Sequence, residues 1–103
     1  MEAVLRAIAA PTRREIIRLV RSRELSAGQI SSHFDVSRPA VSQHLAVLRE
    51  AGLVSERRDG NRRLYRTRPE ALADARAFIE EFWTEHLARL KTAAEEEAQH
   101  ARP

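Results

Sequence analysis

The sequence predicts a mainly α-helical fold with one small β-hairpin, forming a single domain over residues 1–103. Apolar residues recur with the helical period along most of the chain. The period changes only at residues 53–67, where two short runs flank Asp59-Gly60, a pair that favours a tight hairpin turn. At this length, 43% hydrophobic residues fill one modest core and not two.

Charge is segregated along the chain. Residues 1–68 carry 14 arginines against 7 acidic residues, whereas residues 69–103 carry 8 acidic residues against 4 basic ones. A basic body suggests a polyanionic partner. Of the 18 basic residues 17 are arginine, which suits forked contacts with phosphate or guanine, and biased codon usage explains the excess equally well.

Several classes of protein are excluded by what the sequence lacks. It has no cysteine, so it holds no disulfide and no thiolate metal site. No run approaches the roughly 18 continuous apolar residues of a membrane span, and the first residues do not resemble a secretion signal. We therefore expect a cytoplasmic protein with no membrane partner.

Two short helices are expected first. Residues 1–9 place Val4, Leu5 and Ile8 on one side and stop at Ala10-Pro11. Pro11 suits the first position of a helix over residues 11–22, because the first-turn N–H groups have no intrahelical acceptor. Free N–H groups at such a start attract anions, which makes Arg13 a candidate phosphate contact, although a solvated first turn is at least as plausible.

Residues 26–51 predict a helix-turn-helix. Ser26 and Gln29 match a capping box and start a short helix, and a three-residue turn, 35-DVS-37, leads to a longer one. This second helix buries one stripe, Val41, Leu45 and Leu48, and stops at Gly52.

A basic β-wing and a long helix complete the chain. The wing spans residues 53–67, with arginines on both sides of its turn. Residues 70–92 are helix formers with a broad apolar face, whereas residues 93–103 lack large apolar side chains and are expected to fray.

This order of elements resembles the winged helix-turn-helix repressors of the ArsR/SmtB family. The likeness is carried by 10-APTRREIIRLV-20, 36-VSRPAVSQHLAVLREAGLV-54 and 57-RRDGNRRLYR-66. The resemblance implies a symmetric dimer on operator DNA. It also implies that the fourth helix enters the major groove, with the hairpin near the adjacent backbone or minor groove.

Candidate DNA contacts follow from the face opposite the buried stripe, where arginine can read guanine and glutamine can read adenine. About half of the wing arginines, of which Arg62 is the best candidate, are expected to reach phosphate. His44 borders the stripe, so packing and DNA contact both remain open. The candidates are Arg38, Pro39, Ser42, Gln43, His44 and Arg49 from the helix, Arg58, Arg62 and Arg63 from the wing, and Arg13.

The last helix carries more apolar surface than one small domain would use, so the helices at residues 1–9 and 70–92 are expected to form a dimer interface. The alternative is that these side chains fill an intramolecular core. The interface candidates are Val4, Leu5, Ile8, Phe78, Ile79, Phe82, Trp83, His86 and Leu90.

No cofactor, metal or enzymatic activity is expected. The family's metal sensors carry cysteines, or an Asp-x-His pair and later ligands on the last helix. Here 74-DAR-76 has arginine in place of that histidine, and leucines stand at the later ligand positions, 87 and 90. Ser32, His33 and Asp35 are too close together on one short segment for a catalytic triad.

The sequence thus predicts a homodimeric repressor that binds a double-stranded, inverted-repeat operator. The alternative is a winged-helix module that uses the same helix face to bind a protein. The sequence leaves room for a small-molecule effector but does not identify one.

Overall fold

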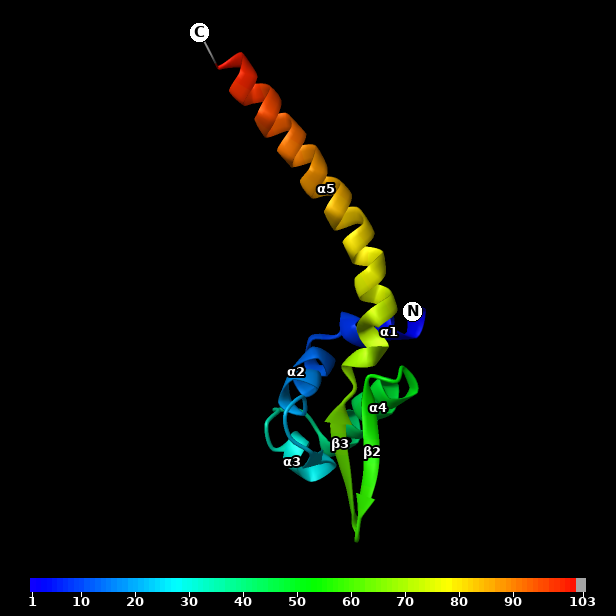
Figure 1. The fold of residues 1–103 in the computed structure, drawn as a ribbon. Helices are drawn as coiled ribbons and strands as arrows, with labels where there is room; N and C mark the ends of the chain where they lie inside the picture. The colour runs from blue at the N-terminus through cyan, green and yellow to red at the C-terminus, as the bar shows by residue number, and fades with distance from the viewer. Residues whose placement is uncertain (102–103) are drawn as a thin grey trace. The chain divides into compact units, whose positions relative to one another are not determined.

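The structure, a computed structural model, describes residues 1–101. Its contacts divide the chain into two units, Met1–Ala73 and a second that begins at Asp74. The first unit holds four helices and the sheet, and the second is the body of the long helix (Figure 1). Among the described residues, no helix is long and apolar enough to cross a membrane.

The helices of the first unit begin where the local signals predict. Pro11 occupies the first turn of its helix, and the backbone N–H of Gln29 donates to Ser26 Oγ at 3.2 Å while the Ser26 N–H donates to Gln29 Oε1 at 2.9 Å. This reciprocal capping box fixes the start of the third helix. The helices are α1 (Glu2–Ala9), α2 (Pro11–Leu19), α3 (Ala27–Ser31) and α4 (Arg38–Glu50). The second helix ends at Leu19, earlier than the predicted residue 22.

The sheet has three antiparallel strands in the order β1-β3-β2, one more strand than the predicted hairpin. Its strands are β1 (Leu25–Ser26), β2 (Val54–Asp59) and β3 (Arg62–Thr67). The strand missed from the sequence is β1, whose two residues pair with Tyr65 and Leu64. The hairpin turn is Gly60-Asn61, one residue later than predicted, because Asp59 still pairs with Arg62. Gly60 supplies the positive φ of 62° that such a turn requires.

The wing is anchored to the helices at its base. The Thr67 N–H donates to Val20 O at 3.1 Å, and Thr67 Oγ1 donates to Ile17 O at 2.7 Å. The Arg68 N–H donates to Leu53 O at 2.8 Å. These bonds tie the end of β3 to α2 and to the start of β2, so the hairpin projects from a fixed base.

Gly52 acts as the C-terminal stop of α4, as predicted. The Leu53 N–H donates to Leu48 O at 2.9 Å and the Gly52 N–H donates to Arg49 O at 3.0 Å, which is the bonding of a Schellman motif. Gly52 has φ 77°, a conformation that side chains with a Cβ rarely adopt. The chain therefore reverses directly from α4 into β2.

The core is small, and α4 packs against it through Val41, Leu45 and Leu48. It includes Val4, which is 6% exposed, so this residue belongs to the core and not to the predicted dimer surface. A valine at this position of α1 faces the same side as buried Ala7, whereas Leu5 points away and is exposed. The buried apolar residues are Val4, Ala7, Ile16, Val20, Leu25, Ile30, Val41, Leu45, Leu48, Leu53, Val54, Leu64, Tyr65 and Ala75.

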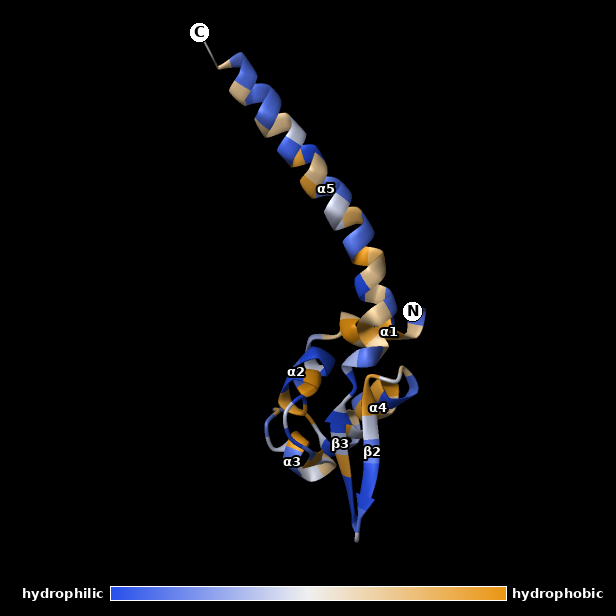
Figure 2. Ribbon diagram, viewed as in Figure 1, coloured by the Kyte–Doolittle hydropathy of each residue, from blue (hydrophilic) through white to orange (hydrophobic). Residues whose placement is uncertain are grey.

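The second unit is the body of α5 (Ala73–His100), which follows a short 3₁₀ turn, η1 (Pro69–Leu72). The helix continues to His100, so the frayed tail predicted over residues 93–103 is wrong as far as residue 100, and residues 102–103 lie outside the described residues. Alanine and glutamate dominate this stretch, and both favour helix without tertiary contacts. Figure 2 shows the hydrophobic colours concentrated in the first half of α5.

Candidate nucleic-acid interface

Helix α4 has the orientation predicted from its apolar stripe. Val41, Leu45 and Leu48 are at most 2% exposed, and the opposite face is polar and open. The outward residues predicted to contact DNA are all exposed, namely Arg38, Pro39, Ser42, Gln43 and Arg49. The burial of one face therefore fixes which side chains the other face presents.

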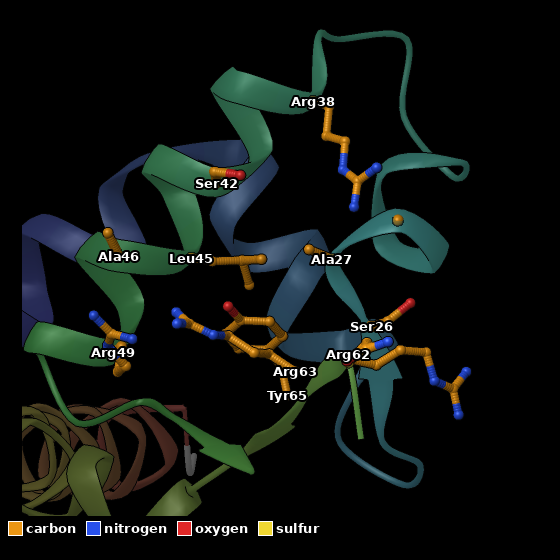
Figure 3. A pocket seen from close by; sticks show the side chains of 12 residues that line it. Ser26, Ala27, Arg38, Ser42, Leu45, Ala46, Arg49, Arg62, Arg63 and Tyr65 are labelled. Carbon is orange, nitrogen blue, oxygen red and sulfur yellow. The ribbon is translucent and has the colours of Figure 1, made fainter. Parts of the chain in front are cut away.

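A groove of about 500 Å³ runs between this helix, the start of α3 and the wing. Figure 3 shows Tyr65 at its floor below Leu45, with Arg38 and Arg49 at the two ends of α4. The groove is lined by Ser26, Ala27, Gly28, Arg38, Ser42, Leu45, Ala46, Arg49, Asn61, Arg62, Arg63 and Tyr65. Four of these are arginines, so the groove is a cationic surface that joins α4 to the wing.

Arg38 leans over the first turn of α3. Its Nη2 lies 3.7 Å from the position that a Cβ would occupy on Gly28, so the guanidinium passes close to bare backbone (Figure 3). Among residues 1–101, Arg38 has no acidic side chain within ion-pair distance. Its charge is available to a ligand at the start of α4.

Arg13 does not face outward as a phosphate contact. Its Nε donates to Ala7 O at 2.7 Å and its Nη2 donates to Arg6 O at 2.9 Å. Arg14 Nη1 donates to Ile8 O at 2.7 Å and to Ala9 O at 3.1 Å. Two adjacent arginines thus satisfy the last four carbonyls of α1, which have no partner within the helix. The prediction of an anion contact overlooked this nearer acceptor set.

His44 is half-buried and packs against Arg13, with its Nδ1 3.3 Å from Arg13 Nη1. Because a guanidinium only donates, this contact is a hydrogen bond when the imidazole is neutral and Nδ1 accepts. Partial burial lowers the pKa of His44, and the neighbouring Arg13 charge lowers it further. Of the two interpretations left open by the sequence, packing explains this geometry.

The wing arginines differ in how their charges are satisfied. Arg57 is held by Glu24 through Nε to Oε2 at 2.9 Å and Nη2 to Oε1 at 3.1 Å, and this hydrogen-bonded cation lowers the pKa of the Glu24 carboxyl. Arg62 lies 3.8 Å from Asp59, a loose pair between two exposed side chains. Arg58 has no acidic partner in the described part of the chain.

Two predicted DNA contacts share one carboxylate. Glu56 Oε2 pairs with Arg49 Nη1, and Glu56 Oε1 lies 3.4 Å from Arg63 Nε. Glu56 was not among the predicted site residues, because its pairing depends on the hairpin folding beside α4. The only local signal was an acid directly before the two arginines of β2.

Helix α5 exposes the apolar side chains expected of an interface. Phe82 and Trp83 are 58% and 59% exposed. The Phe78 and Phe82 rings meet edge to face at 5.0 Å between centroids, and the Trp83 and His86 rings lie 5.7 Å apart. Ile79 and Leu90 are also exposed, as is Leu87, which the prediction left out.

No metal-binding cluster is present in residues 1–101: no three His, Asp or Glu side chains are placed to hold an ion.

Comparisons with known proteins all match this chain to bacterial transcriptional regulators. The model of the family described as "Bacterial regulatory protein, arsR family" matches residues 10–56. An HTH-type transcriptional regulator of Mycobacterium tuberculosis is 44% identical over 81 residues, which cover 79% of this chain and 76% of the relative. The transcriptional repressor SdpR of Bacillus subtilis is 37% identical over 75 residues, covering 73% and 83%. Among solved structures, an ArsR-like transcriptional regulator from Rhodococcus superposes with a TM-score of 0.76 at 30% identity, covering 92% of this chain and 90% of the other.

The contact between His44 and Arg13 predicts a pH dependence of stability. A histidine whose pKa is lowered by folding stabilises the folded state above its ordinary value of 6.5, and that contribution is lost as the pH falls below it. His44→Gln keeps an acceptor for Arg13 and removes the titration. Chemical denaturation at about pH 7.5 and about pH 5.5 should therefore show a smaller loss of unfolding free energy for the variant than for the wild type.

The control is His33→Gln, at an exposed histidine beside α3. The His33 ring contacts Gln29 O and not Arg13, so the comparison separates loss of the contact between His44 and Arg13 from loss of any histidine. An equal reduction in both variants would remove His44 from this role.

Proposed function

We propose that this chain, which belongs to the ArsR family of bacterial regulatory proteins, is a homodimeric repressor of an inverted-repeat operator. Members of this family are DNA-binding transcriptional regulators and not enzymes. The proposal places the protein in the cytoplasm, where it reaches bacterial operator DNA.

The observation that carries the proposal is the open polar face of α4 beside a cationic groove. A major groove about 12 Å wide admits an α-helix, and its base edges offer the acceptors and donors that arginine and glutamine match. Arg38 is suited to guanine O6 and N7, and Gln43 to adenine N6 and N7. Ser42 lies between them on the same exposed face and suits either base or phosphate.

Contacts with the DNA phosphate backbone are assigned to wing arginines that no carboxylate holds closely. We place Arg58 and Arg62 of the wing against phosphates, because no carboxylate holds either of them closely. Arg13 is left out because α1 carbonyls engage it, and His44 is left out because it packs against Arg13. Arg49 and Arg63 are both paired with Glu56 and are not assigned to a phosphate.

A second copy of the chain is the proposed cover for the apolar face of α5. Six large side chains on this helix are close to half-exposed or more, a larger apolar surface than isolated exposed residues explain: Phe78, Ile79, Phe82, Trp83, Leu87 and Leu90. A two-fold dimer presents two recognition helices about 34 Å apart, one turn of DNA, and therefore selects an inverted repeat. On α1, exposed Leu5 and half-buried Ile8 remain available to the same partner.

The direct test is selection of bound duplexes from a random DNA pool. An inverted repeat is expected, and its spacing gives the separation of the two helices. Affinity for the selected duplex should fall by about 10³ to 10⁵ between 50 and 200 mM salt if about 6 to 10 phosphates are contacted. No duplex binding at low salt would instead favour a protein-binding module.

Gln43→Ala tests base reading. The variant should lose about 1 to 3 kcal/mol on the selected duplex and discriminate less at the contacted base pair, because its hydrogen bonds are to a base edge. The measurement is binding to the selected duplex and to single-base variants of it. Arg58→Ala is the contrasting variant, since loss of a phosphate contact should weaken all duplexes alike and lower the salt slope by about 1. A uniform loss for Gln43→Ala would contradict the assignment.

Phe82→Glu tests the dimer. A carboxylate at the centre of the apolar face should give monomers with little operator affinity, as measured by sedimentation and duplex binding. Thr84→Glu adds the same charge on the polar side of α5, about 160° of helical rotation away, and should remain dimeric. A dimeric Phe82→Glu variant would refute the interface.

A further inference from the structure

One carboxylate connects the recognition helix to the wing. Glu56 lies on β2 with its side chain 18% exposed, while both of its cationic partners are about half-exposed. One oxygen pairs with Arg49 at the end of α4, and the other lies 3.4 Å from Arg63 on β3. The acid therefore sits underneath two arginines that line the groove facing the proposed DNA site.

The sheet register explains why these groups meet. Glu56 is paired directly with Tyr65 across the hairpin, and Arg63 is two residues from Tyr65, so all three side chains emerge on the same face. Tyr65 is buried, and burial together with the Glu56 charge raises the pKa of its hydroxyl. The carboxylate is thus confined between a buried ring and two guanidinium groups.

The acids that pair with wing arginines are not equivalent. The pair of Asp59 and Arg62 is 3.8 Å long with both side chains more than half-exposed, so water and salt screen it. Glu24 holds Arg57, whose position in the register puts it on the other face of the hairpin from Glu56. Of the acids in residues 1–101, Glu56 alone pairs with two arginines, and both of them line the groove.

This arrangement bears on how DNA sequences are distinguished. Attraction between cations and phosphates supplies essentially all of the affinity for nonspecific DNA but only part of the affinity for an operator. An acid that holds two arginines therefore weakens binding to nonspecific DNA more than binding to an operator. It also fixes the end of α4 to the wing, which keeps the base-reading face in one orientation.

We propose that Glu56 is a specificity-determining positioning residue, which restrains Arg49 and Arg63 and thereby lowers the affinity for nonspecific DNA relative to the operator. The inference rests on the proposed DNA-binding function. The two can fail separately, because absence of salt-dependent duplex binding by the wild type would refute the function itself.

The test compares Glu56→Gln with Glu24→Gln, which removes the same charge from beside Arg57, an arginine on the opposite face of the hairpin. Each variant is titrated with the selected duplex and with a scrambled duplex of equal length, between about 50 and 200 mM KCl. Glu56→Gln should bind the scrambled duplex about tenfold more tightly near 0.1 M salt and steepen its salt slope by about 1 to 2, because one or two arginines become free. The ratio of operator to scrambled affinity should fall about tenfold, whereas Glu24→Gln should largely keep that ratio.

Equal effects of the two variants on both duplexes would show that only bulk charge matters and would overturn the proposal. An unchanged scrambled-duplex affinity in Glu56→Gln would overturn it as well.

A second pair of variants keeps the proposal testable if Glu56→Gln does not fold. Arg58 and Arg63 are paired directly across the hairpin and are both exposed, but only Arg63 is held by Glu56. Arg58→Gln should lower the salt slope on scrambled DNA by about 1, and Arg63→Gln should lower it by clearly less. Equal slopes for the two variants would contradict the restraint by Glu56.

Discussion

The structure depends on one constraint, which is that α4 must bury a single narrow stripe in a very small core. Val41, Leu45 and Leu48 are almost completely buried. Rotation of the helix by one residue, about 100°, would place Ser42 in the core without a hydrogen-bond partner. The capped start at Ser37 and the reversal at Gly52 fix the length of the helix as well. The direction in which Gln43 points is therefore a consequence of packing, not a separate property of the surface.

Hydrogen bonds and carboxylates then divide the arginines into engaged and open groups. Arg13 and Arg14 complete the end of α1, and Arg57 is held by Glu24. In the described part of the chain, Arg38 and Arg58 have no such partner. Beside the exposed face of α4, open positive charge is thus presented at the start of the helix and on the wing. Net charge alone would have suggested a more uniform attraction for polyanions.

The sequence predicted the features that depend on neighbouring residues. The capping box at Ser26, the stop at Gly52 and the stripe of α4 are local patterns, and each lies where it was expected. The missed features depend on residues distant in the sequence. Strand β1 exists because β3 offers it an edge, and the engagement of Glu56 with Arg63 requires the hairpin register. Which base each outward side chain reads depends on the DNA as well as the chain, so neither the sequence nor the fold of one copy determines it.

The two halves of α5 have different requirements, and this links dimer formation to DNA recognition. Residues 93–100 are rich in alanine and glutamate and are helical by propensity, whereas residues 78–90 expose aromatic and aliphatic side chains that gain free energy when covered. In the proposed dimer that gain joins two recognition helices, so the second half-site is bound at a high effective concentration. A single copy, with several of its arginines engaged by its own carboxylates and carbonyls, offers fewer open cations to DNA than its composition suggests. The proposed restraint of Arg49 and Arg63 within each protomer would therefore make operator binding by the proposed dimer depend more strongly on two half-sites at the correct spacing.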